Sequence, residues 1–251
     1  MENTDFIFGI HPVLEAIEAG RTIDRIYIKK DMAAETAGRL AALAREHRIP
    51  FMRVPVERLD RYTRRNHQGV VALLSAVEYH RLGNLVTDLF ESGALPFVVV
   101  LDGITDVRNF GAIARTAECC GVNAIVIPER GSVGVGADAV KTSAGALMTL
   151  PVARERSLAT GVRYLKESGF RIVAVTEHES LNYTEFDYTT PVALVMGAED
   201  KGISEEILAL ADCRAGIPMF GSIGSLNVSV AAGVMMYEVV RQRLRANLEV
   251  I

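Results

Sequence analysis

Three short polar segments interrupt otherwise apolar sequence, and each follows a predicted strand. The first spans residues 106–111 and continues to Arg115, the second spans 196–202, and the third spans 225–229. Ligands of an open α/β sheet bind where its strands end. We therefore expect the three segments to meet at one site. Together they indicate the kind of site far more specifically than any one of them does alone.

The first segment, Asp-Val-Arg-Asn-Phe-Gly, precedes a predicted helix. We expect Asn109 to lie just before that helix, where its side chain can cap free backbone amides. Gly111 would let the chain turn tightly into the helix. Arg115, about one turn further on, would project from the same end of the sheet. Taken alone, this segment is better explained by a capping Asn109 and a surface charge at Arg115.

The second segment places Gly197, Glu199 and Gly202 directly after an apolar strand. Glycines at a strand end allow the backbone to approach a ligand or another chain segment closely. Two roles stay open for Glu199: it orients Asn109 or Arg115, or it forms an ordinary pair at a helix start. Lys201 is most simply an exposed charge.

The third segment has Ser225 and Asn227 around a predicted helix start. Both residue types are favoured as helix N-caps, so capping alone is a strong explanation. Leu226 and Val228 alternate with them and are expected to be buried. The two polar side chains would then lie at the lip of a pocket, which favours a binding role.

Missing motifs exclude several familiar sites. No Gly-x-Gly-x-x-Gly follows the first strand of the second predicted sheet, and no phosphate loop with Gly-Lys-Ser/Thr is present. The His, Cys and Asp residues show no metal-ligand spacing, so we expect no metal. Nothing around Ser225 resembles a nucleophile elbow, although spacing alone leaves a Ser-His-Asp triad open.

From residue 96 onward, short apolar runs alternate with helical patterns. This arrangement predicts an α/β domain with a doubly wound parallel sheet over 96–251. The predicted strands are 97–101, 124–127, 172–175, 192–196 and, more weakly, 215–218. The predicted helices are 112–120, 158–167, 205–211 and 227–244.

Residues 1–76 also alternate helical and strand patterns, which predicts a small α/β domain. Its predicted helices are 12–19 and 33–46, and its predicted strands are 26–28, 51–54 and 70–74. Residues 77–95 contain polar residues and glycines. We expect them to link the two domains, with a short helix near 85–90.

The bulk composition is that of a globular protein. A chain of 251 residues can bury two modest cores. No apolar run is long enough to span a bilayer, so we expect no membrane association, and the acidic start lacks a signal-peptide pattern. The cysteines at 119, 120 and 213 show no redox or metal spacing. Reduced thiols and a cytoplasmic location are therefore expected.

The charge is unevenly distributed along the chain. The net charge of −4 argues mildly against a nucleic-acid partner. However, the first 75 residues carry 12 Lys and Arg against 10 Asp and Glu, while the remainder carries 15 against 21. Five arginines cluster within 53–65, for which a solvated helix face is the ordinary explanation. The charge pattern alone shows only that one end of the chain could meet a polyanion.

Taken together, the three segments resemble the motifs of the SpoU (TrmH-like) RNA ribose 2'-O-methyltransferases of the SPOUT class. The resemblance covers essentially all of 96–251. Residues 9–13 and 67–71 resemble the L30e-like substrate-binding domain of rRNA-modifying members, and the 23S rRNA guanosine-2'-O-methyltransferases are the most similar group. Arg108 and Phe110 depart from the pattern, since many members carry His and Leu there. The matching residues are Asn109-Phe110-Gly111 with Arg115, Gly197-Ala198-Glu199 with Gly202, and Ser225-Leu226-Asn227-Val228-Ser229.

The resemblance implies a deep trefoil knot at the carboxyl end that binds S-adenosylmethionine. It also implies a homodimer whose active site draws on both chains, with RNA, most simply 23S rRNA, as the partner. The cofactor-binding residues that it implies are Thr176, Gly197, Ile217 and Leu226. The RNA-binding residues expected in the amino-terminal domain are His11, Arg64, Arg65 and His67.

The implied reaction methylates a ribose 2'-hydroxyl, a group that DNA lacks, so no activity on DNA is expected. A guanidinium is effectively always protonated. We therefore expect Arg115 to bind the target phosphate and polarise the hydroxyl rather than act as a simple base. The implied catalytic residues are Asn109, Arg115, Glu199, Ser225 and Asn227.

Two alternatives stay open from the sequence. One is a tRNA ribose methyltransferase of the same class, which the L30e-like domain disfavours. The other is an RNA-binding SPOUT protein that has lost catalysis, which the intact catalytic set disfavours. A generic nucleotide-binding α/β domain does not explain the three segments.

Overall fold

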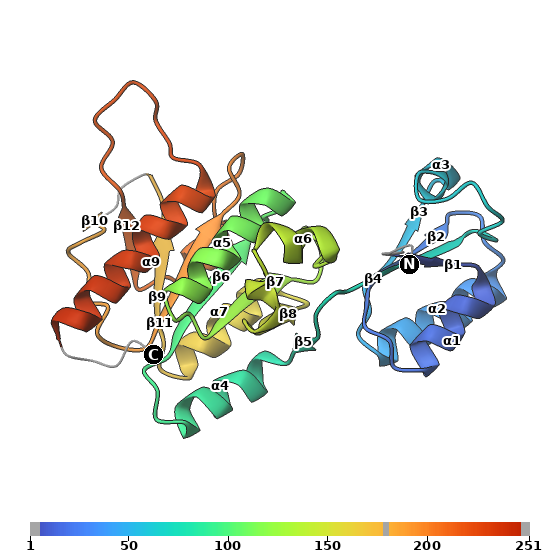
Figure 1. Ribbon diagram of the computed structural model, residues 1–251, viewed down its shortest axis with the longest axis horizontal. Coiled ribbons are helices and arrows are strands. Elements are labelled where there is room, and N and C mark those ends of the chain that lie inside the picture. The colour runs from blue at the N-terminus through green and yellow to red at the C-terminus, as the bar shows by residue number, and fades with distance from the viewer. Residues whose placement is uncertain (1–5, 178–180, 247–251) are drawn as a thin grey trace. The chain divides into compact units, whose positions relative to one another are not determined.

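The apolar residues of this chain divide between two hydrophobic regions. The computed structural model describes residues 6–177 and 181–246. Contacts within the chain define two units (Figure 1). The first extends to Glu78 and includes Gly134–Asp138, and the second comprises Tyr79–Val133 and the residues from Ala139 onward. Two α/β units are therefore present, as the sequence predicts.

A four-stranded sheet forms the centre of the first unit, in the order β1-β4-β2-β3. Strands β2 and β3 are parallel, while β4 pairs antiparallel with both β1 and β2. The strands are β1 (Phe6–Phe8), β2 (Ile23–Lys29), β3 (Phe51–Val54) and β4 (Val70–Leu74). The helices are α1 (Ile10–Glu18), α2 (Ala34–Glu46) and α3 (Val56–Asp60).

Both faces of this small sheet are covered by helices. Helices α1 and α2 bury Val13 and Leu40 against one face. On the other face, Leu59 of α3 packs with Tyr27 of β2. Each fully buried side chain of this size contributes about 1.5–3 kcal/mol. The unit therefore has a core of its own.

Eight parallel strands form the sheet of the second unit, in the order β10-β12-β9-β11-β6-β7-β8-β5. They are β5 (Tyr79–His80), β6 (Phe97–Asp102), β7 (Ala124–Pro128), β8 (Val152–Glu155), β9 (Arg171–Val175), β10 (Leu181–Asn182), β11 (Val192–Gly197) and β12 (Cys213–Gly216). The helices are α4 (Leu82–Glu91), α5 (Val107–Cys119), α6 (Ala137–Thr142), the 3₁₀ helix η1 (Ala146–Met148), α7 (Leu158–Glu167), α8 (Glu205–Leu208) and α9 (Val228–Arg245).

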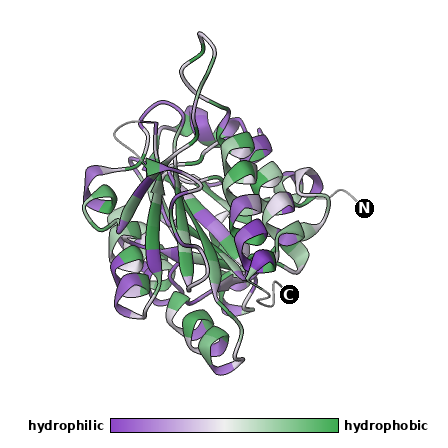
Figure 2. Cartoon of the chain, turned by 90° about the vertical axis from the view of Figure 1, so that its left-hand side faces the viewer, coloured by the Kyte–Doolittle hydropathy of each residue, from purple (hydrophilic) through white to green (hydrophobic). Residues whose placement is uncertain are grey.

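Helices cover both faces of the large sheet, which explains why its central strands are almost continuously apolar (Figure 2). On one face, Leu82 of α4, Leu165 of α7 and Ile207 of α8 join a single core with the strand residues. On the other face, α9 packs against α5 and β11.

The order of the strands differs from their order in the chain. Strand β11 lies between β9 and β6, so it pairs with a strand that comes much earlier in the sequence. Strand β12 then pairs with the other side of β9, and α9 returns to β11 and α5. This order agrees with the trefoil knot implied by the resemblance, and the knot itself stays a prediction.

Most predicted elements are confirmed, and three match to the residue: the strands 51–54 and 70–74 and the helix 158–167. The helix predicted at 112–120 begins earlier, at Val107, and the helix predicted at 205–211 ends at Leu208. Within the described part of the chain, no helix is both long and apolar enough to cross a membrane.

Residues 77–95 are structured rather than a simple linker. Strand β5 pairs with β8 at the edge of the large sheet. Helix α4 buries Leu82 and Val86 in the core of the second unit. The boundary between the two units therefore falls between Glu78 and Tyr79, and the segment that the sequence assigns to a linker belongs mainly to the second unit.

Candidate active site

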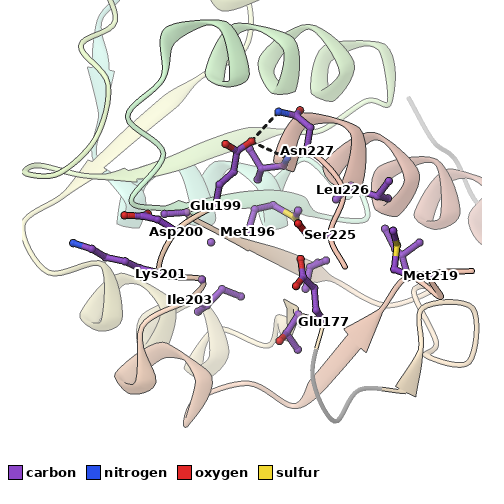
Figure 3. A pocket seen from close by; sticks show the side chains of 18 residues that line it. Glu177, Met196, Glu199, Asp200, Lys201, Ile203, Met219, Ser225, Leu226 and Asn227 are labelled. Carbon is purple, nitrogen blue, oxygen red and sulfur yellow. Dashed lines mark hydrogen bonds between the residues drawn. The ribbon is translucent and has the colours of Figure 1, made fainter. Parts of the chain in front are cut away.

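A cavity of about 520 Å³ lies at the carboxyl ends of the central strands of the second unit (Figure 3). Strand β9 ends at Val175, β11 at Gly197 and β12 at Gly216. The loops that follow these strands line the cavity with residues from 175–177, 196–203 and 217–231. The second and third polar segments of the sequence thus face the same space.

Hydrogen bonds connect the first polar segment to the other two. Asn227 Nδ2 donates to Glu199 Oε1 at 2.8 Å and to Asn109 Oδ1 at 3.0 Å. Asn109 Nδ2 donates to the same Glu199 oxygen at 3.2 Å, and so does the backbone amide of Val228 at 3.4 Å. Figure 3 shows Glu199 and Asn227 facing each other at the rim of the cavity. We call these three side chains the Asn109–Glu199–Asn227 network.

Asn227 has a second function as the N-cap of α9. Its Oδ1 accepts a hydrogen bond from the backbone amide of Ser229 at 3.0 Å. The helix start and the polar network therefore use opposite ends of one amide group. The capping explanation is confirmed, and the binding role of Asn227 stays a prediction, since the structure shows only that the oxygen caps the helix while the nitrogen joins the network.

Two glycines shape the loop that carries Glu199. A side chain at Gly197 would place its Cβ 2.2 Å from the carbonyl carbon of Gly202 and 2.4 Å from the amide nitrogen of Ile203. Gly202 itself has φ of +66°, a region that favours glycine. Ala198 and Gly202 exchange backbone hydrogen bonds of 3.2 and 2.8 Å. This tight turn holds Glu199 at the rim.

Asn109 is not a helix cap, contrary to the prediction from its sequence context. Helix α5 begins at Val107, and Asp106 is its cap, because the Asp106 carboxylate accepts from the amides of Arg108 and Asn109 at 2.8 and 2.9 Å. Asn109 therefore lies inside the first turn of the helix. Its side chain is left free to bind Glu199 and Asn227.

Gly111 also differs from its predicted role, since it lies within α5 and not in a turn. A Cβ at this position would lie 2.2 Å from Thr142 Oγ1 and 2.9 Å from the Thr142 carbonyl carbon. Glycine is therefore needed so that α5 can approach the end of α6. The packing of α5 depends on this contact.

The other catalytic residues expected from the resemblance lie in different settings. Ser225 is exposed and lines the cavity. Arg115 is exposed on α5 and does not line the cavity of its own chain. Among the hydrogen bonds of the described residues, none joins Arg115 to the Asn109–Glu199–Asn227 network. The residues expected to bind the cofactor all line the cavity: Thr176, Gly197, Ile217 and Leu226.

Two lining residues were not expected at the site from the sequence. Glu177 lies two residues after β9, and Met219 lies three residues after β12. The signal for both was their position shortly after a strand, whereas Asp200 belongs to the second polar segment, which was expected at the site. Carboxylates outnumber cations on the wall, because Glu177, Glu199 and Asp200 face the same cavity as the single ammonium group of Lys201. An acidic wall favours a cationic ligand.

The residues expected to bind RNA lie on the first unit. His11, Arg64 and Arg65 are exposed. His67 is instead engaged within the unit: its Nδ1 accepts from the amide of Gly69 at 2.9 Å, so its Nε2 carries the proton and donates to Asp60 at 2.9 Å. His67 thus orders the loop that carries the two arginines, and Arg64 and Arg65 keep exposed charges.

No group of three or more His, Cys, Asp or Glu residues suited to a metal ion occurs in the part of the chain that the structure describes. All three cysteines are free thiols, and only Cys119 is exposed. Burial raises the pKa of Cys120 to about 11, so this thiol stays protonated at neutral pH.

Comparison with known families assigns both units. Residues 96–237 match the model of the SpoU rRNA Methylase family. Residues 6–80 match the model described as RNA 2'-O ribose methyltransferase substrate binding. The first match contains the whole of the Asn109–Glu199–Asn227 network, and the second contains all four residues expected to bind RNA.

Similar proteins agree with this assignment. A Staphylococcus saprophyticus protein assigned to the TrmH family tRNA/rRNA methyltransferases is 37% identical over 94% of this chain and 95% of its own. Bacillus subtilis YacO, which is assigned to the same family, is 36% identical over 95% of this chain and 96% of its own length. The solved AdoMet-bound rRNA methyltransferase of Sinorhizobium meliloti is 26% identical with a TM-score of 0.60, covering 95% of this chain and 87% of its own. The A. aeolicus TrmH/SpoU tRNA modifying enzyme is 32% identical with a TM-score of 0.56, covering 66% and 86%.

Proposed function

Because the chain belongs to the SpoU rRNA methylase family, we propose that its substrate is a guanosine of 23S ribosomal RNA. At the level of the family, the chain is an RNA 2'-O-ribose methyltransferase that depends on S-adenosylmethionine. The choice of a 23S guanosine is the finer step of the proposal. It is supported by the likeness of the three motifs to those of the 23S rRNA guanosine-2'-O-methyltransferases and by the substrate-binding unit.

The cavity suits S-adenosylmethionine in size and charge. Its volume of about 520 Å³ falls within the range of about 300–1,000 Å³ that is usual for small-molecule sites. The sulfonium and ammonium groups of this molecule are positive, and Glu177, Glu199 and Asp200 supply negative charge. The tight glycine turn at Gly197 and Gly202 holds the loop that carries Glu199 and Asp200 on the cavity wall.

The cofactor supplies an activated methyl group on a positively charged sulfur, so the protein has no need of a metal for this step. What the chain must provide is alignment of the ribose oxygen and assistance with its proton. The Asn109–Glu199–Asn227 network fixes the first turn of α5, the loop after β11 and the start of α9 relative to one another. Ser225 lies near it on the cavity wall, where it shapes the entry for the ribose. This convergence of three distant segments beside the cavity is the observation that carries the proposal.

Arg115 is proposed to bind the target phosphate and to polarise the 2'-hydroxyl. Its guanidinium stays charged, so it acts by hydrogen bonding and charge rather than by accepting the proton. Since Arg115 does not line the cavity of its own chain, we propose that a homodimer brings the Arg115 of one chain to the cavity of the other. The exposed apolar side chains Val230, Tyr237 and Leu244 on α9 support such a dimer.

The first unit is proposed to hold the RNA, with Arg64 and Arg65 contacting phosphates. The acidic second unit contributes less to RNA affinity, because phosphate contacts dominate such binding. The reaction itself excludes DNA, which has no 2'-hydroxyl. We place the protein in the cytoplasm, where ribosomal RNA is available to it.

A tRNA ribose is the second candidate substrate. The similarity of 66% of this chain to the A. aeolicus TrmH/SpoU tRNA modifying enzyme favours it. The match of residues 6–80 to a substrate-binding model favours the rRNA proposal instead. The two candidates differ only in the RNA that is methylated.

Mapping of ribose methylation in a strain that lacks this gene separates the candidates. We expect one 2'-O-methylguanosine to disappear from 23S rRNA and to return when the wild-type gene is restored. A lost tRNA methylation with intact rRNA would overturn the 23S proposal in favour of tRNA. Unchanged methylation in both RNAs, together with no binding of S-adenosylmethionine in calorimetry, would point to a non-catalytic protein.

A further inference from the structure

Residues 217–226, which connect β12 to α9, form an arm that protrudes at the carboxyl end of the large sheet. The arm extends beyond the helices and strands of its unit in Figure 1, and it remains the highest point after the 90° turn of Figure 2. Its sequence contains no charged residue. Among the described residues, no hydrogen bond ties the arm to the rest of the unit. The arm is therefore free to adapt to a ligand.

The arm carries the most exposed large apolar side chain of the described chain. Phe220 is 97% exposed, and Ile223 on the same arm is 73% exposed. Gly221 and Gly224 have open space around them, since a Cβ added at either position would meet no atom within 4 Å. The ring of Phe220 is thus not buried within this chain, and burial against a binding partner would be favourable.

Both ends of the arm form part of the cavity wall. Ile217 and Met219 line the cavity from one end, and Ser225 and Leu226 line it from the other. Phe220 follows Met219 directly, so its Cα lies about 3.8 Å from that of a lining residue. Phe220 itself does not line the cavity, so its ring is available to a group that lies outside the cavity and near its mouth.

We propose that Phe220 stacks on a nucleobase of the RNA next to the ribose that is methylated. This inference rests on the proposed function and adds a residue that selects the target. Proteins recognise specific RNA sites mainly by stacking unpaired bases on aromatic side chains. An uncharged arm suits contact with a base rather than with the phosphate backbone. The arm thereby favours a target nucleotide that is already unstacked.

A second copy of the chain is the competing occupant of this surface. A second copy could instead contact the exposed apolar side chains of α9, where Val230 and Tyr237 are 52% and 54% exposed. That helix is supported by its packing on α5 and β11. The arm has no such support, which favours RNA as its occupant.

The absence of tryptophan from this chain allows a direct test. In Phe220→Trp, the introduced indole is the only one, and stacking on a base is expected to quench its fluorescence. Tyr237→Trp on α9 serves as the matched probe. The RNA is an in vitro transcript that accepts methyl groups from the wild-type enzyme. We expect this RNA to quench the fluorescence of Phe220→Trp strongly and that of Tyr237→Trp weakly. Dilution of the protein without RNA should change only the fluorescence of Tyr237→Trp.

Binding and kinetics give an independent readout. Phe220→Ala is expected to weaken RNA binding and to raise KM for RNA by about tenfold, as for loss of one stacked base. Affinity for S-adenosylmethionine in calorimetry and the oligomeric state should not change. Phe220→Tyr should retain RNA affinity, and Ile223→Ala on the same arm should lose much less.

Three outcomes would overturn the inference. One is fluorescence of Phe220→Trp that changes with protein concentration and does not change when RNA is added, because a second copy of the chain would then cover the arm. Another is loss of dimer in Phe220→Ala, and the third is an unchanged KM for RNA in that variant. If the wild type methylates RNA in these experiments, the proposed function stands and only the role of Phe220 fails. If the wild type methylates neither rRNA nor tRNA, the proposed function fails, and the stacking inference fails with it.

Discussion

Glu199 shows how one carboxylate oxygen can hold together three segments that are far apart in the sequence. Its Oε1 accepts from Asn109 Nδ2, Asn227 Nδ2 and the Val228 amide at 3.2, 2.8 and 3.4 Å. The same carboxylate contributes negative charge to the cavity wall. Glu199 thus combines a structural role with an electrostatic one, and two substitutions can separate them.

We predict that Glu199→Gln keeps most of the stability but weakens binding of S-adenosylmethionine, because the amide oxygen still accepts hydrogen bonds while the charge is lost. Glu199→Ala should also destabilise the second unit, by about 1 kcal/mol, since the network loses its acceptor at an exposed site where water solvates the freed donors. Calorimetry and urea unfolding measure the two effects. Asp200→Ala, an exposed neighbour, controls for stability and should unfold like the wild type. Equal cofactor affinity in Glu199→Gln and the wild type would contradict the electrostatic role.

Sequence reasoning identified the polar residues but not all of their geometry. Asn109 and Asp106 are both good N-cap types three residues apart, and only the position of the helix start decides between them. In the structure Asp106 is the cap, and Asn109 faces Glu199. The sequence also did not reveal why residue 111 is glycine, because the contact of Gly111 with Thr142 involves a segment distant in sequence.

Among the secondary-structure elements, α9 is anchored by a buried arginine near its end. Arg243 is 3% exposed. Its guanidinium donates to the carbonyl oxygens of Leu95 at 2.8 Å, Pro96 at 3.0 Å, Thr190 at 3.1 Å and Tyr188 at 3.2 Å. Burial lowers the pKa of Arg243 to about 10, so the side chain is still charged at neutral pH. The helix is thereby tied both to the start of β6 and to the segment before β11.

We predict that Arg243→Lys destabilises the second unit by about 3 kcal/mol, because an ammonium cannot reach four carbonyl groups arranged for a planar guanidinium. Arg245→Lys on the same helix is the matched control, since Arg245 is exposed, and it should change stability by less than about 0.5 kcal/mol. Urea unfolding followed by circular dichroism measures both variants. Similar midpoints for the two variants would show that the anchor contributes little.

Elements were predictable where their own residues determine them. The helix 158–167 has apolar residues at helical spacing and an N-cap at Ser157, whose side chain accepts from the Thr160 amide. Strand β8 (Val152–Glu155) was not predicted, because half of its residues are charged. It exists because it pairs with β7 and β5. Such pairing depends on tertiary structure, which a local pattern does not contain.

At the scale of the whole molecule, charge separates the two units. The basic residues of the amino-terminal part, including the exposed Arg64 and Arg65, lie in the unit that matches a substrate-binding model. The acidic cavity lies in the unit that matches the methylase model. This distribution agrees with the proposal that the first unit holds the RNA and the second unit holds the cofactor.

We predict that the double charge reversal Arg64→Glu/Arg65→Glu weakens RNA binding by at least tenfold and reduces its salt dependence, because two phosphate contacts are lost. Affinity for S-adenosylmethionine should stay unchanged. The control Arg39→Glu/Arg45→Glu changes the net charge equally through exposed residues of α2. Gel-shift titration at two salt concentrations and calorimetry provide the measurements. An equal effect of both double variants on RNA, or a parallel loss of cofactor affinity, would refute this division between the units.

The contact of Arg243 with Leu95 and Pro96 has a consequence for synthesis on the ribosome. It joins residues just before the first long strand of the large sheet to residues in its last helix. Until the final turns of that helix have been translated, these carbonyl groups lack their donor. The amino-terminal unit can fold while translation continues, whereas the catalytic unit must wait for almost the entire polypeptide. Nascent chains that stall late would therefore carry a finished RNA-binding unit and no functional cavity.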